Sequence, residues 1–131
     1  MTPNVPRRAL IAVTDAQAVL HGEHMTGIFI GEVMHPYNVF TAAGFEVDIA
    51  SENGKYYVDW LSEQPSFLSG PDVTEWEDLN SSFRKKLDSL QKGPDVDSSK
   101  VGPSLYPHCE GVAAHQMYSM ACSLHLLAML P

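Results

Sequence analysis

The chain has 131 residues, with 8 basic and 16 acidic side chains, 44% hydrophobic content and a formal net charge of −8. This length fits one compact domain, excludes a multidomain machine and is sufficient for a buried core without disulfides. Because a strongly acidic chain repels phosphate backbones and anionic lipid, we expect neither nucleic acid nor a membrane as a partner.

The first eight residues contain prolines and two arginines, and no apolar run with a small-residue cleavage site follows them. No secretory leader is predicted from this pattern. We therefore expect a reducing, cytoplasmic location.

Three segments in the first half predict a strand, a helix and a second strand. Residues 8–14 form a short apolar run between polar neighbours, which is typical of a strand buried on both faces. Residues 26–43 carry apolar side chains at helical spacing and end at Gly44, a C′ glycine, although Pro36 predicts a kink or two abutting helices. Residues 45–50 alternate apolar and acidic side chains and predict a strand parallel to the first. Together they predict a parallel βαβ unit, and hence an α/β fold.

Ligands of open α/β sheets bind beyond the carboxyl ends of the strands. The loop after Thr14, the start of the first helix and the residues after Ser51 are therefore expected to face any site. His21 and His24 lie in the first of these loops, but two loop histidines three residues apart are commonly only solvated.

Residues 52–79 are rich in glycine, proline, acids and aromatics without a sustained period, which predicts an irregular excursion or cap. Its aromatic side chains either anchor the loop to the core, which is the more usual role, or form a sticky surface for unfolded proteins. The aromatic residues considered for these two roles are Tyr56, Tyr57, Trp60 and Trp76.

A further amphipathic helix is predicted after this excursion. Its apolar positions fall at i, i+4 and i+7, namely Phe83, Leu87 and Leu90. Asn80 or Ser81 can cap its start, and its end is expected at residues 92–94, Lys-Gly-Pro.

Residues 101–131 differ in composition from residues 1–100. All 8 basic and 15 of the 16 acidic residues lie in residues 1–100, whereas the tail holds only Glu110. At the overall charged content the tail would hold about five or six charges. The tail also holds both cysteines, Cys109 and Cys122. We therefore expect residues 1–100 to form part of an α/β domain and residues 101–131 to be a divergent apolar tail.

Several motifs in residues 7–100 have the spacing of one family. They are Thr26-Gly27, Glu32, His35-Pro36, Phe40, Gly44-Phe45-Glu46-Val47-Asp48, Ser51-Glu52, Gly54 and Asp59. On these residues the chain resembles the ThiJ/PfpI superfamily of the class I glutamine-amidotransferase-like fold, and most closely its branch of heat-shock protein 31-like chaperones and glutathione-independent glyoxalases. The resemblance implies a truncated flavodoxin-like (Rossmann-like) α/β sandwich.

For function, the resemblance implies a D-lactate dehydratase, a lyase that detoxifies methylglyoxal, a small 2-oxoaldehyde, to D-lactate without glutathione or another cofactor. The branch is also associated with a stress-response chaperone role. Its chemistry uses a cysteine on a strand-to-helix turn, in a run of the form Ala-x-Cys-His-Gly-Pro, beside a glutamate that Glu32 matches. The thiolate would form a hemithioacetal, the carboxyl group would move a proton between carbons, and the thioester would be hydrolysed.

The chain departs from the family after the helix around Phe83. There the family continues with a strand, a glycine-histidine loop and the cysteine elbow, and the sequence predicts none of them. Cys109 is followed by Glu110-Gly111, and Cys122 lies in an apolar, helix-like stretch where a thiol is normally a small buried hydrophobe. Because neither cysteine can be assigned as the nucleophile, we expect this chain to be inactive.

Two candidate residues lie on the first predicted helix. Glu32 has apolar neighbours that allow its burial, although the pattern alone favours a solvent-facing acid, since acids are rarely buried unless paired. The resemblance favours the catalytic position. His35, before Pro36, is expected to bond a backbone carbonyl at a kink, a structural role, rather than act as a ligand or acid-base group.

The tail contains five metal-compatible side chains: His108, Cys109, His115, Cys122 and His125. Their spacing matches no zinc pattern, so no metal site is expected. Residues 112–130 are apolar, but polar residues interrupt them and no basic residue flanks them. A packed or collapsed helix is therefore favoured over a membrane span.

Two functional hypotheses follow. The chain is a truncated member of the glyoxalase branch with Glu32 as its sole catalytic match, or it is a non-enzymatic chaperone-like or dimerising fragment. In the second case, exposed sheet edges and the apolar tail would mediate homodimerisation or the binding of unfolded clients. A third outcome is a chain that does not fold, because the first strands of a doubly wound sheet need partners.

Overall fold

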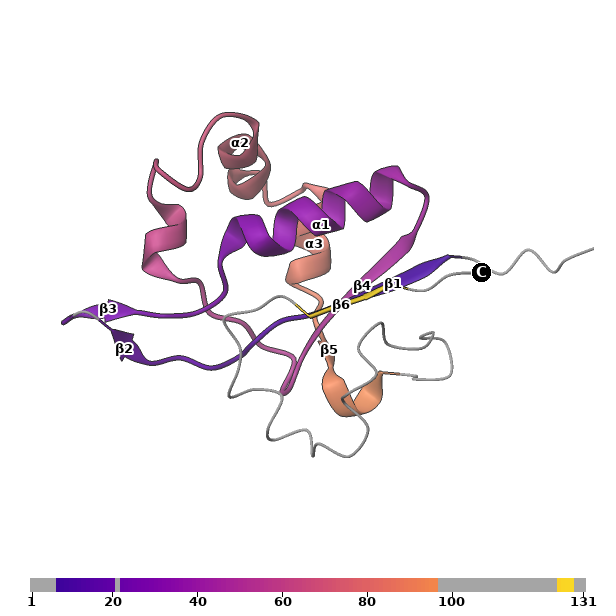
Figure 1. The fold of residues 1–131 in the computed structure, drawn as a ribbon, viewed down its shortest axis with the longest axis horizontal. Coiled ribbons are helices and arrows are strands. Elements are labelled where there is room, and N and C mark those ends of the chain that lie inside the picture. The colour runs from indigo at the N-terminus through magenta and orange to yellow at the C-terminus, as the bar shows by residue number, and fades with distance from the viewer. Residues whose placement is uncertain (1–6, 21, 97–124, 129–131) are drawn as a thin grey trace, which may run out of the picture.

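The computed structural model describes residues 7–20, 22–96 and 125–128 (Figure 1). These residues form a mixed α/β arrangement. In chain order the elements are β1 (Arg8–Ala12), β2 (Val19–Leu20), β3 (His24–Met25), α1 (Ile30–Ala42), β4 (Glu46–Ser51), the 3₁₀ helix η1 (Trp60–Glu63), α2 (Pro71–Glu77), α3 (Ser82–Leu87), β5 (Gln91–Lys92), the 3₁₀ helix η2 (Gly93–Asp95) and β6 (His125–Ala128).

The main sheet has the strand order β5-β4-β1-β6. β1 runs parallel to β4, with Ile11 opposite Ile49, and β4 runs parallel to β5. The predicted parallel βαβ unit of β1, α1 and β4 is therefore confirmed. A separate two-stranded antiparallel sheet, β2 with β3, lies in the loop between β1 and α1, where no strand was predicted.

The core lies between one face of this sheet and the helices α1 and α3 (Figure 1). From the sheet it takes alternate residues, Ala9, Ile11, Val13, Val47 and Ile49. From the helices it takes Ile30, Val33, Met34, Tyr37, Phe83 and Leu87. Burial of these side chains is the main stabilising contribution to the fold.

The first helix is shorter than predicted, because it begins at Ile30 rather than at residue 26. Ile28 instead forms an isolated parallel bridge with Val58, which takes its backbone out of the helix. The helix is continuous through Pro36, so the alternative of two abutting helices is wrong. Gly44 has φ 83° and takes the predicted C′ position, directly after the C-cap residue Ala43.

Residues 52–79 are more regular than predicted, because they contain η1 and α2. α2 begins after the N-cap residue Gly70, which has φ 59°, and Pro71 occupies its first turn. A proline is favoured at this position of a helix. The third helix begins as expected, with the Ser81 hydroxyl accepting a hydrogen bond from the Arg84 N–H at 3.1 Å. It ends at Leu87 rather than at residues 92–94, because Gln91–Lys92 turn into β5 beside β4.

Two strands correct expectations for the second half of the chain. β5 shows that a short strand does follow α3. β6 shows that residues 125–128 are extended and pair antiparallel with β1, whereas a helix was expected over residues 112–130. β6 thereby covers one edge of β1. The remainder of that apolar stretch, with His115 and Cys122, lies outside the described residues, as do His108 and Cys109. No described helix is long and apolar enough to cross a membrane.

Candidate functional site

The loops that follow β1 and β4 are joined by Asp15 and Asn53. Asp15 Oδ2 accepts hydrogen bonds from the Asn53 backbone N–H at 3.0 Å and from its side-chain amide at 2.6 Å. The carboxyl ends of parallel strands meet at one edge of a sheet, so the two loops expected to face a site do lie together.

The segment before α1 is fixed against the chain that follows β4. Ile28 donates its N–H to the Tyr57 carbonyl at 2.7 Å, and Asp59 donates its own to the Ile28 carbonyl at 3.0 Å. The Thr26 hydroxyl donates to the Asp59 carboxylate at 3.0 Å. These contacts set where α1 begins, and therefore where the side chains of its first turn lie.

Glu32 lies in that first turn of α1. Its side chain is exposed, whereas Val33 and Met34 beside it are buried in the core. The solvent-facing alternative for Glu32 is therefore the observed one. Among residues 7–19 and 22–96, whose side chains the structure describes, the Glu32 carboxylate has no hydrogen-bond or ion-pair partner.

His35, one turn further along α1, contacts a carboxylate rather than the predicted backbone carbonyl. Its Nε2 atom lies 2.7 Å from Asp72 Oδ2 in α2. On the next turn Asn38 donates to Glu75 at 2.7 Å, also in α2. The two contacts join α1 to α2, which gives His35 a structural role through a different partner.

The aromatic residues of the excursion divide into anchors and exposed rings. Tyr56 and Trp76 pack against the core, as the anchoring interpretation predicts. Trp60 stacks on His24, with 3.7 Å between ring centroids, so His24 is not merely solvated. Tyr57 is exposed. His21 lies outside the described residues.

The Tyr56 hydroxyl has a defined partner on the turn after α3. It donates a hydrogen bond to Asp88 at 2.8 Å. Burial, and then the bond to the Asp88 carboxylate, raise the pKa of Tyr56 to about 12. The phenol is therefore held in its neutral, donating form.

A hollow of about 430 Å³ opens at the carboxyl-end edge of the sheet. It is lined by Asp15, Asn53, Lys55, Tyr57 and Lys92. The sequence did not reveal this convergence, although Lys55 and Lys92 are two of only 8 basic residues, and Lys55 follows a predicted strand. In the described part of the chain, no three His, Cys, Asp or Glu side chains gather as metal ligands would.

Comparison with known proteins identifies relatives of one kind. Over 94 residues the chain is 36% identical to a glutathione-independent glyoxalase of Saccharomyces cerevisiae, covering 71% of this chain and 40% of that protein. It is 34% identical over 109 residues to glyoxalase 3 of Candida albicans, covering 82% and 44%. No family model matches the chain.

The fold agrees with this sequence similarity. A crystal structure of glyoxalase III from Candida albicans superposes with a TM-score of 0.67 at 35% identity, covering 70% of this chain and 38% of that one. The described residues therefore form part of a flavodoxin-like α/β fold, homologous to glutathione-independent glyoxalases. The chain spans 40% and 44% of the length of these two curated relatives.

Proposed function

We propose that this chain represents the N-terminal part of a glutathione-independent glyoxalase of the ThiJ/PfpI superfamily, in its heat-shock protein 31-like branch. The proposal rests chiefly on Glu32, an exposed acid in the first turn of α1 with no partner among residues 7–19 and 22–96, in a chain that is 36% identical to such an enzyme. A free carboxylate at this position is suited to move a proton within a bound substrate. The substrate is a small 2-oxoaldehyde, methylglyoxal, and the product is D-lactate.

The chemistry requires a thiolate together with this carboxylate. A thiolate sulfur adds to the aldehyde carbon, and the carbonyl electrons move to oxygen to give a hemithioacetal. Glu32 takes the proton from this carbon and returns it to the neighbouring carbonyl carbon, while the hydroxyl proton of the hemithioacetal passes to the neighbouring carbonyl oxygen. The first carbon thereby becomes a thioester and the second an alcohol. Water then cleaves the carbon–sulfur bond, which releases D-lactate and regenerates the thiol. The sequence of steps is an internal redox exchange, so it needs no external oxidant.

The 131-residue chain is proposed to be inactive by itself. Neither Cys109 nor Cys122 is followed by the His-Gly-Pro of the elbow motif. Without a thiolate held beside it, Glu32 has no hemithioacetal from which to take a proton. The glyoxalase activity is thus assigned to the fold this chain shares, and it requires an elbow from further sequence.

A chimera tests both parts of this proposal. Residues 1–96 are joined to the C-terminal part of the Saccharomyces cerevisiae relative, and D-lactate formed from methylglyoxal is measured beside the unaltered chain. We expect an active chimera, a loss of about a hundredfold or more on Glu32→Gln, and no D-lactate from the unaltered chain. The matched control is Glu23→Gln, an exposed acid outside α1, which should leave the rate unchanged. A chimera that keeps its rate after Glu32→Gln contradicts the role of Glu32.

The second candidate function is a non-enzymatic, chaperone-like or dimerising chain. It is favoured by large apolar side chains on the surface, with Val39, Leu79 and Phe67 among them. Suppression of the thermal aggregation of a model client, together with analytical ultracentrifugation, tests it. Loss of suppression in Phe67→Ser but not in Glu32→Gln would support client binding. Cytoplasmic localisation, and the absence of nucleic acid and membrane partners, belong to both proposals.

A further inference from the structure

We propose that the hollow at the carboxyl-end edge of the sheet binds a small oxyanion, a carboxylate or a phosphate, between Lys55 and Lys92. The inference does not depend on the glyoxalase function, because it concerns binding and uses neither Glu32 nor a cysteine. It rests on where the two lysines lie, on how the turn between them is built, and on the charges that surround them.

The hollow receives side chains from three neighbouring parallel strands. Asp15 follows β1, Lys55 and Tyr57 follow β4, and Lys92 ends β5. All of these positions are at the carboxyl ends, where ligands of open α/β sheets bind because the connecting loops diverge there. A small anion placed in the hollow would therefore occupy the usual ligand-binding edge of this fold class.

The turn after β4, which precedes Lys55, packs against Lys92. Gly54 has φ 73°, and a Cβ atom at this position would lie 3.1 Å from the Cγ atom of Lys92. The turn is thus packed against the Lys92 stem, and its positive φ favours a glycine at position 54. The Lys55 N–H donates to the Ser51 hydroxyl at 2.8 Å, and Ser51 is buried, so the backbone that carries Lys55 is anchored.

The lysines of the hollow lack acidic partners among the described residues. Neither Lys55 nor Lys92 has a described carboxylate within ion-pairing distance, whereas Arg8 and Lys86 are ion-paired with Asp48. Lys85 is likewise unpaired among the described residues, so it is the hollow, and not the missing carboxylate, that distinguishes Lys55 and Lys92. Both ammonium groups belong to residues that line one hollow, and a bound anion there would offset their like charge.

The carboxylate of the hollow is already engaged by a neighbour. Asp15 Oδ2 accepts both hydrogen bonds from Asn53, which hold the carboxylate in the loop contact between β1 and β4. The exposed Tyr57 ring adds a phenolic group to the lining. The hollow therefore presents two ammonium donors against one hydrogen-bonded carboxylate, which suits an anion with two or more oxygens.

Isothermal titration of the full chain with sodium phosphate and with sodium D-lactate tests the site, at constant ionic strength. Saturable binding of either anion is expected, and neutral lactamide should not bind. Phosphate alone would indicate a phosphate site, and D-lactate alone would indicate a carboxylate site. Each of Lys55→Gln and Lys92→Gln should weaken binding about tenfold, since each removes one charge-assisted hydrogen bond.

The control variant is Lys85→Gln, which removes an exposed lysine of α3 that does not line the hollow. It should leave the affinity unchanged. All three lysines are exposed, so unaltered thermal unfolding is expected and would exclude misfolding as the cause of weaker binding. No saturable binding of either anion, or an equal loss in Lys85→Gln, would overturn the proposal.

Discussion

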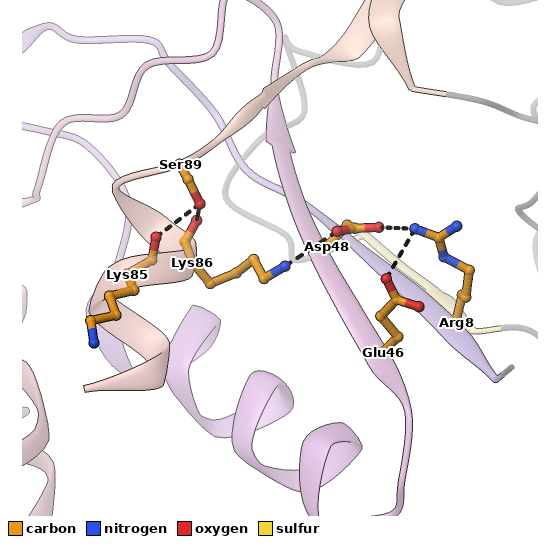
Figure 2. A network of polar contacts seen from close by, with 6 residues as sticks. All are labelled: Arg8, Glu46, Asp48, Lys85, Lys86 and Ser89. Carbon is orange, nitrogen blue, oxygen red and sulfur yellow. Dashed lines mark hydrogen bonds and ion pairs between the residues drawn. The ribbon is translucent and has the colours of Figure 1, made fainter. Parts of the chain in front are cut away.

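Arg8 and Asp48 form an ion pair across the parallel strands β1 and β4, with 2.9 Å between the guanidinium and the carboxylate (Figure 2). Lys86 of α3 approaches the other carboxylate oxygen at 3.4 Å. Arg8 also contacts Glu46 at 3.4 Å. Asp48 thus connects two strands and a helix through one partly buried charge, and its two cations compensate for its desolvation.

Asp48→Asn should lower the free energy of unfolding by about 1–2 kcal/mol, between the values usual for exposed and for buried ion pairs. The expectation follows from the burial of the Asp48 side chain, which is 17% exposed. The matched control is Glu46→Gln, because Glu46 meets the same arginine but is 56% exposed. That change should cost no more than about 0.5 kcal/mol. Urea unfolding followed by tryptophan fluorescence measures both, and equal effects would contradict the role given to Asp48.

The parts of the fold that were predictable are those encoded by local pattern. β1 and β4 are apolar or alternating runs between polar residues, and both were placed to within two residues. Ser81 was one of the two capping residues predicted, with Asn80, because its side-chain type and its position before an apolar period are local signals. Gly44 was recognised as the C′ residue of α1 because a glycine after an apolar helical period is also a local signal.

The parts that were not predictable depend on tertiary contacts. The two-residue strands β2 and β3 are too short to show a period. α1 begins later than predicted because Ile28 pairs with Val58, and no local pattern predicts that bridge. At the candidate site, Glu32 was identified through a resemblance, whereas the hollow with Lys55 and Lys92 was missed. Its residues meet only when three strands lie side by side.

Gly27→Ala should destabilise the fold by about 2 kcal/mol or more, because the site is overpacked against backbone. A Cβ atom there would meet the Tyr57 carbonyl oxygen at 2.1 Å, and the backbone that it meets cannot rotate away. Gly31→Ala is the control, since its Cβ would make an ordinary 3.5 Å contact with His35 inside α1. That change should be neutral or stabilising by up to about 1 kcal/mol. Thermal unfolding by circular dichroism distinguishes the two, and a tolerated Gly27→Ala would contradict the tight approach.

Alkaline pH should weaken the fold through Tyr56. Its pKa rises from 10.0 in the unfolded chain to about 12 in the fold. Below about pH 10 both states carry the phenolic proton, so the contribution of the hydrogen bond to Asp88 is fully present. Between about pH 10 and 12 only the unfolded chain loses the phenolic proton, so the stability of the fold falls with pH. The contribution of Tyr56 is lost as the pH passes its folded-state pKa.

Two measurements check the Tyr56 prediction. Urea unfolding at intervals from pH 9 to 12 should give a shallower pH dependence for Tyr56→Phe than for the unaltered chain. Tyr57→Phe is the matched control, because the Tyr57 ring is exposed and should leave the dependence unchanged. Absorbance at the tyrosinate band should also show less titration near pH 12 in Tyr56→Phe. Identical pH profiles for the two variants would refute the assigned cause.

Phe83→Ala should be the most damaging of these substitutions. Phe83 is fully buried where α3 meets α1, and its ring lies 5.5 Å from that of Tyr37, between centroids. Removing it should leave a cavity and lower the free energy of unfolding by about 3–5 kcal/mol.

Phe67→Ala is the matched control for Phe83, because it removes the same atoms from a ring that is 49% exposed. The Phe67 ring retains one edge contact with Phe29, at 5.1 Å between centroids, so a cost of about 1 kcal/mol is expected. Urea unfolding gives a midpoint for each variant, and if the m values are equal, the difference between the midpoints measures the difference in stability. If the two variants lost similar stability, α3 would not be packed on α1 as described. A large loss confined to Phe83→Ala instead places the helix contact at the centre of the core, because only a side chain surrounded on all sides leaves a void when it is removed.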